Sequence, residues 1–255
     1  MLEPFQLPFV QRGVVEIVVL AVPAGLLGTW IVLRGLAFFA HAVGTAAFPG
    51  LVLADGLGFA APLGAFSAAV AFSLGTTLLG RRKEEEGDST VAIVLVACLA
   101  GGVILASDVF GSGANVETLL FGSLLLVDGG DIALAAVAAA VTLVASLLLG
   151  HRWLAAGFDS APGAALHTGG RSLDLALLCL VALSVTAALS VVGALLVAAL
   201  FVVPALTARL FVQRMRSWQL ASVVLVAVEG TAGLWLSVKT DAPPGRRVFH
   251  ASHSR

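Results

Sequence analysis

Charged residues are scarce in this chain of 255 residues. Asp, Glu, Lys and Arg make up 11% of it, whereas soluble domains contain about 25%. A hydrophobic content of 59% and a mean hydropathy of +1.05 predict an integral membrane protein. A formal net charge of −1 provides no basic face for phosphates and excludes nucleic acid as a partner. Cys98 and Cys179 lie apart in apolar runs, so we expect small core residues rather than a disulfide or a zinc pair.

The sequence also lacks the motifs of several enzyme classes. No GxxxxGK[ST] pattern is present, so the chain has no P-loop of its own with which to bind and hydrolyse ATP. We find neither a paired-histidine metalloprotease motif nor a clear nucleophile with its base, which disfavours an intramembrane enzyme. No cleavable signal peptide is expected, because the N-terminal residues run into a span of full length.

Apolar runs of membrane length predict an all-α fold, a polytopic transmembrane helix bundle of about eight spans. The predicted spans are 13–33, 36–57, 59–79, 91–106, 132–149, 173–189, 191–210 and 220–238. A further apolar piece, residues 118–127, is too short to cross and suits a re-entrant or interfacial half-helix. We expect one multi-pass transmembrane domain over residues 1–245, followed by a basic polar tail over residues 246–255.

The positions of Lys and Arg predict the orientation of the bundle. Three basic loops, each separated from the next by two spans, can all be cytoplasmic: Arg81, Arg82 and Lys83; Arg152 and Arg171; and Arg209, Arg214 and Arg216. Counting spans back from the basic loop at Arg81 places the turn at Arg34 inside and the N-terminus outside, although the positive charge of Arg12 weakly opposes an outside N-terminus.

Three segments carry a family-like pattern. Residues 30–56, WIVLRGLAFFAHAVGTAAFPGLVLADG, have a Phe-rich start and a Pro-Gly pair. Residues 191–211 are rich in Gly and Ala and end in Pro, Ala, Thr, Ala and Arg, and residues 157–166 read GFDSAPGAAL. In this order and spacing they resemble the permease subunits of the zinc and manganese ABC importers, the ABC-3 family.

The resemblance implies a set of partners and a function. It implies a homodimer of permease chains in the cell membrane, an ATP-binding cassette ATPase docked on the cytoplasmic loops, and an extracellular metal-binding lipoprotein. The chain itself would be no enzyme and hold no permanent cofactor; zinc or manganese would be the substrate, moved by alternating access. Residues 157–166 would be the coupling segment, with Phe158 as an apolar knob, Asp159 as an N-cap and a short helix to Leu166.

The chain departs from the family pattern in two places. Many members have an Asp and, four residues later, a His in the second span, whereas this chain has His41 and Thr45. Residues at i and i+4 share a helix face, so the common pair would form half of a metal site. Members also continue past the equivalent of residues 243–245 into one more span, where this chain turns to RRVFHASHSR. The family's last span is therefore expected to be missing, and a non-functional truncated permease is one alternative.

Ionisable groups inside the spans are candidates for the metal pathway, because such groups are expensive in lipid. His41 and Glu229 lead, since imidazole and carboxylate suit zinc, and manganese accepts oxygen ligands. Glu229 lies near the middle of its span, so we expect it to face the bundle interior. The alternatives are hydrogen bonds from His41 and from a protonated Glu229 to helix backbone. A proton-coupled secondary transporter, in which both residues relay protons, is a second function class.

Three further residues are weaker metal candidates. Thr45 offers a hydroxyl on the face of His41. Glu16 lies near the start of the first span, where pairing with Arg12 or capping the helix start is the alternative. Asp108 closes the fourth predicted span and either attracts cations at the outer mouth or forms a turn.

Overall fold

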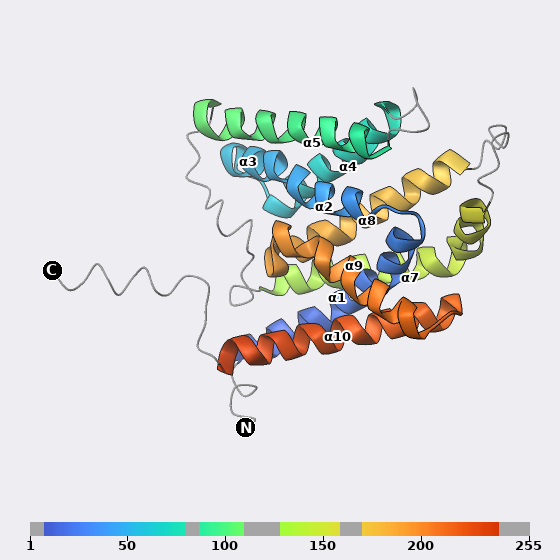
Figure 1. Ribbon diagram of the computed structural model, residues 1–255. Helices are drawn as coiled ribbons and strands as arrows, with labels where there is room; N and C mark the ends of the chain where they lie inside the picture. Colours follow the sequence, from blue (N-terminus) through green and yellow to red (C-terminus); the bar gives the residue numbers. More distant parts are fainter. Residues whose placement is uncertain (1–7, 80–86, 110–127, 159–169, 240–255) are drawn as a thin grey trace.

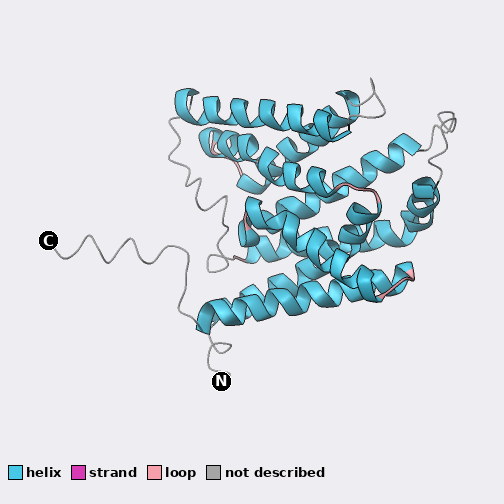
Figure 2. Ribbon diagram, in the orientation of Figure 1, coloured by secondary structure: helices cyan, strands magenta, loops and turns pink. Residues whose placement is uncertain are grey.

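The structure, a computed structural model, describes residues 8–79, 87–109, 128–158 and 170–239, and its regular elements in these ranges are all helical (Figures 1 and 2). The elements are α1 (Pro8–Leu33), α2 (Ala37–Ala46), α3 (Phe48–Leu57), α4 (Ala61–Leu79), α5 (Gly87–Ile104), the π-helical η3 (Leu105–Val109), α7 (Gly129–Phe158), α8 (Gly170–Val192), α9 (Ala194–Phe211) and α10 (Met215–Lys239). The predicted all-α bundle is confirmed. The proposed half-helix at 118–127 and the tail at 246–255 lie outside the described residues.

Seven helical segments within the described ranges are long and apolar enough to cross a membrane. One of them, residues 37–57, combines α2 and α3. The predicted span 191–210 corresponds to α9, whose apolar part, Leu196–Phe211, is shorter than the other seven. As the sequence indicates, α8 and α9 are joined almost directly, through Gly193 at φ +78°.

The helices form an inner and an outer group. α1, α8 and the α2–α3 span are the most buried, and they supply much of the hydrophobic core, including Trp30, Phe39 and Val181. α5, α7 and α10 are mostly exposed and carry large aliphatic side chains on their surface, among them Ile93, Leu147 and Val228. Large exposed apolar faces of this kind are expected where transmembrane helices meet lipid or another membrane subunit.

Close helix packing depends on small residues at a few crossings. A Cβ added to Gly28 of α1 would lie 2.2 Å from the carbonyl oxygen of Phe201 in α9. At the crossing of α3 and α4, a Cβ on Gly50 would lie 2.0 Å from the carbonyl oxygen of Gly64. Helices in membranes associate through such small residues, because they allow two backbones to approach closely.

The connections of the bundle gather at its two ends. In Figure 1 the turn between α1 and α2, the turn between α9 and α10, the end of α7 and the start of α8 all lie at the right. The start of α1 and the end of α10 lie at the left. Because Arg34, Arg152, Arg209 and Arg214 belong to the right-hand end, the positive-inside rule identifies that end as cytoplasmic.

Candidate functional site

The span that carries His41 has a local interruption at Ala47. The predicted single span over 36–57 is confirmed as one span over 37–57, and within it α2 ends at Ala46 and α3 begins at Phe48. Pro49 stands in the first turn of α3, and it has no N–H to donate to the Thr45 carbonyl four residues earlier. Ala47 keeps a helical backbone conformation. Its N–H donates to the Val43 carbonyl and its carbonyl accepts from the Leu51 N–H, both at 3.1 Å, so the interruption is a local kink in one span.

His41 lies half-buried on α2, one turn before this interruption. α2 packs against α4, α5, α8 and α9, so the helix that carries the imidazole is surrounded by the bundle. The His41 ring makes no hydrogen bond or ion pair with another residue of the described ranges. The Thr45 hydroxyl, also half-buried, donates to the His41 carbonyl at 3.3 Å.

Glu229 does not occupy the predicted interior position. It is exposed on α10, a helix that packs mainly against α1 and α9 and not against α2. The adjacent Gly230 lies against Ile17 of α1, where an added Cβ would be 2.5 Å from Ile17 Cγ2. The packed face of α10 is thus turned away from Glu229, and the prediction of an interior carboxylate is wrong for the single chain.

Glu16, by contrast, is fully buried, with 0% exposure. α1 begins at Pro8, so Glu16 lies two turns inside the helix and does not cap its start. Arg12 is exposed, and within the described residues no hydrogen bond reaches either carboxylate oxygen of Glu16. Pairing with Arg12 and capping are therefore both contradicted, and Glu16 points into the packed interior of the bundle.

The predicted metal-ligand residues do not lie together in the single chain. No group of three or more His, Cys, Asp and Glu side chains able to hold a metal occurs among the described residues. Glu16 lies near the outer end of α1, whereas His41 follows the cytoplasmic turn. Asp108 belongs to η3, and Phe158 is the last residue of α7; neither side chain is among the described ones. Asp159 and Leu166 lie outside the described ranges.

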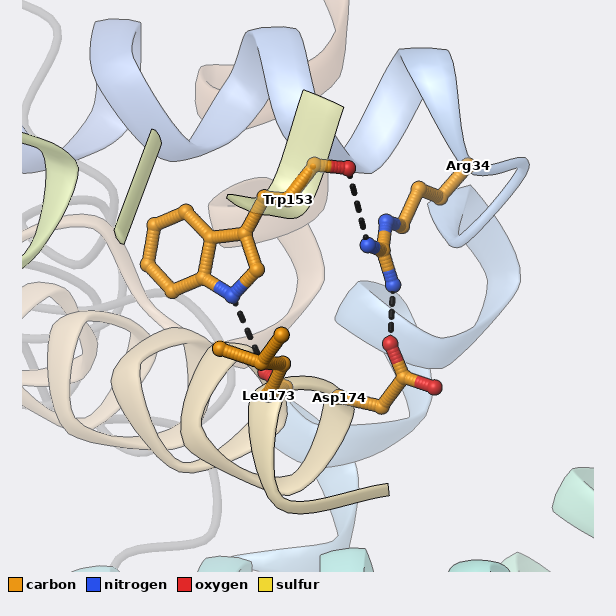
Figure 3. Close-up of polar contacts among 4 residues, drawn as sticks. All are labelled: Arg34, Trp153, Leu173 and Asp174. Atoms are coloured by element: carbon orange, nitrogen blue, oxygen red, sulfur yellow. Dashed lines mark hydrogen bonds and ion pairs between the residues drawn. The ribbon is translucent and has the colours of Figure 1, made fainter. Parts of the chain in front are cut away.

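One polar cluster at the cytoplasmic end was not predicted. The Arg34 guanidinium forms an ion pair with Asp174 of α8 and donates to the Trp153 carbonyl of α7 at 3.1 Å (Figure 3). The Trp153 indole N–H donates to the Leu173 carbonyl at 3.0 Å. The cluster joins the α1–α2 turn to the helices on both sides of residues 159–169. Its only sequence signal is a lone Arg in a short turn, which does not identify a partner 140 residues away.

Comparisons with known proteins place these features in a family context. The model of the family described as "ABC 3 transport family" matches residues 6–252. The chain is 28% identical over 243 residues to the chelated iron transport system membrane protein YfeD of Yersinia pestis, covering 95% of this chain and 82% of that protein. It is 27% identical over 232 residues to the manganese transport system membrane protein MntC of Listeria monocytogenes, covering 91% and 82%.

A solved structure shows the same fold. A chain of PsaBC from Streptococcus pneumoniae in complex with Fab aligns with a TM-score of 0.81 and 25% sequence identity. The alignment covers 95% of this chain and 89% of that one.

Proposed function

The chain belongs to the ABC 3 transport family, and from that premise we propose that it imports a divalent transition metal ion with energy from a separate ATPase. Its relatives are membrane permeases, and the chain is a multi-pass permease subunit of the plasma membrane. The observation that carries the proposal is the fold match at a TM-score of 0.81 over 95% of the chain. It is supported by the half-buried position of His41 on α2, a helix that packs against α4, α5, α8 and α9.

Manganese is the proposed substrate, with zinc as its closest competitor. Relatives are named for manganese and for chelated iron, which favours a first-row metal ion. The His41 imidazole accepts zinc or manganese. Compared with the family's common Asp and His pair, His41 and Thr45 keep one imidazole nitrogen and have a neutral hydroxyl in place of the carboxylate. The choice of manganese therefore rests on the names of the relatives and not on this pair of residues. The ion is cargo, so the proposal requires no resident cofactor.

Three protein partners complete the proposed importer. An ATP-binding cassette subunit docks at the cytoplasmic end, where residues 159–169 join α7 to α8, and its closure drives alternating access. An extracellular metal-binding lipoprotein delivers the ion at the opposite end.

A second copy of the chain is the third partner. A carboxylate facing lipid near mid-span costs roughly 2.5 to 3.5 kcal/mol, and Glu229 is exposed on the single chain. We therefore place Glu229 between two copies. Cross-linking at Glu229→Cys, in a chain whose own cysteines are replaced, tests this arrangement; only monomer under oxidation would contradict it.

Metal accumulation in a bacterial host without its own manganese importers tests the proposed function. The permease is expressed with a candidate ATPase and metal-binding lipoprotein from the same organism, and cell manganese, zinc and iron are measured. We expect manganese accumulation that disappears when the P-loop lysine of the ATPase is replaced by alanine. Accumulation that survives this replacement but collapses with the proton gradient would instead identify a proton-coupled carrier. No accumulation and no co-purifying ATPase would identify a non-functional permease.

A further inference from the structure

The backbone at Arg34 is held in one conformation by the end of α1. Gly35 adopts φ +67°, the left-handed region that glycine occupies without strain. The Leu36 N–H donates to the Ile31 carbonyl at 2.8 Å, and the Gly35 N–H donates to the Val32 carbonyl at 3.3 Å. These two bonds form a Schellman motif, and α2 begins directly after it at Ala37. Arg34 is thus rigidly connected to the start of the helix that carries His41.

The Arg34 side chain reaches from this turn to two other helices. The Arg34 side chain is 14% exposed, and its guanidinium contacts Asp174 near the start of α8, whose side chain is 51% exposed. A second nitrogen of the same group donates to the Trp153 carbonyl near the end of α7. Figure 3 shows the guanidinium between these two acceptors. A planar group with donors in fixed directions is suited to such a bridge, whereas a lysine ammonium is not.

Trp153 makes a second connection between the same helices. Its buried indole donates to the Leu173 carbonyl of α8 and packs edge-on against Trp30 of α1, with ring centroids 5.6 Å apart. The end of α7, the start of α8 and the end of α1 are therefore cross-linked by three polar bonds and one aromatic contact. A displacement of α7 and α8 at this end must move the α1–α2 turn, or break these bonds.

We propose that Arg34 is a positioning residue that transmits movement of the α7 and α8 ends to α2, and so couples ATP hydrolysis to metal transport at His41. The inference rests on the proposed function, in which the ATPase acts on residues 159–169 between α7 and α8. Packing also holds α1 beside α7 and α2 beside α8. Among the described residues, the Arg34 bridge adds polar bonds from the α1–α2 turn to both α7 and α8. An ion pair whose acid is half exposed contributes little to folding, so its loss separates coupling from stability.

The test compares metal moved per ATP hydrolysed in proteoliposomes that contain the complete transporter. Asp174→Asn removes the charge, Asp174→Glu retains it, and Arg34→Met removes the guanidinium at similar length. Asp88→Asn is the matched control, because Asp88, in the first turn of α5, is also an exposed acid near the start of a helix. We expect Asp174→Asn and Arg34→Met to lower transport per ATP by about tenfold, within the range typical of coupling between sites.

The ATPase rate and ATPase binding should stay close to those of the unchanged chain in both variants. The melting temperature should stay unchanged in Asp174→Asn, whereas Arg34→Met also loses the bond to the Trp153 carbonyl and should melt slightly lower. Asp174→Glu should restore coupling, and Asp88→Asn should leave it unchanged. Unchanged transport per ATP in Asp174→Asn overturns the inference. So does an equal fall of ATPase rate, assembly and transport, since that pattern indicates a purely structural bond. If the unchanged complex hydrolyses ATP without moving metal, the proposed function itself fails, and the inference fails with it.

Discussion

Gly50 of α3 and Gly64 of α4 contact each other through their backbones, so alanine at position 64 perturbs one helix crossing directly. A Cβ on Gly64 lies 2.2 Å from the Gly50 carbonyl oxygen and 2.7 Å from Ala54 Cβ, whereas ordinary van der Waals contact begins at 3.4 Å. The obstructing oxygen belongs to a helix backbone, so α3 and α4 must move apart. Overpacking typically lowers the free energy of unfolding by about 1 to 3 kcal/mol. Because the obstacle here is a rigid helix backbone, we expect a loss near the upper end of that range, about 3 kcal/mol.

A loss of that size should lower the apparent melting temperature of the purified chain in detergent by about 10 °C. Fluorescence-detected melting measures it. Gly101→Ala is the control, because a Cβ at that position in α5 meets no atom within 4 Å and alanine is the better helix former. We expect Gly101→Ala to melt at or above the temperature of the unchanged chain. Equal melting of Gly64→Ala and Gly101→Ala would refute the close contact of α3 and α4.

Three further predictions use the same melting assay. Glu16→Met should raise the melting temperature, because it removes a buried carboxylate that has no partner among the described residues. Burying such an unsatisfied group destabilises the folded chain by about 1 to 3 kcal/mol, so a lower melting temperature would contradict this prediction. Trp218→Phe should cost about 1 kcal/mol, because it deletes the 2.7 Å bond from the indole to the Ala205 carbonyl; unchanged melting would argue against that bond. Gly35→Ala should cost about 1 to 2 kcal/mol at φ +67°, and Gly35→Asn less; the reverse order would exclude the left-handed turn.

Hydropathy predicts the spans well because a helix that crosses a bilayer needs about 20 consecutive, mostly apolar residues, and such runs can be read directly from the sequence. The predicted span 173–189 lies within Gly170–Val192, and 132–149 lies within Gly129–Phe158. α7 continues to Phe158 because a helix does not have to end where its residues become polar. The interruption at Ala47 was not predicted, since the residues around it are as apolar as those of a continuous span.

The side chains of the candidate site are harder to place from sequence. A span that is apolar on all sides has no polar face to distinguish lipid from protein, so the outward Glu229 and the buried Glu16 could not be told apart. The Arg34 bridge joins residues 140 positions apart, and its geometry depends on how three helix ends are packed. The composition around Trp153 and Asp174 therefore contains no sign of it.

Uptake of radioactive manganese into proteoliposomes, with the complete transporter and ATP on the cytoplasmic side, tests the central claim most directly. We predict ATP-dependent uptake by the unchanged chain and a loss of apparent manganese affinity in His41→Ala of about tenfold or more, the size typical of perturbed metal sites. His151→Ala, an exposed histidine at the end of α7, should behave as the unchanged chain. Equal uptake by His41→Ala and His151→Ala would contradict a metal pathway at His41.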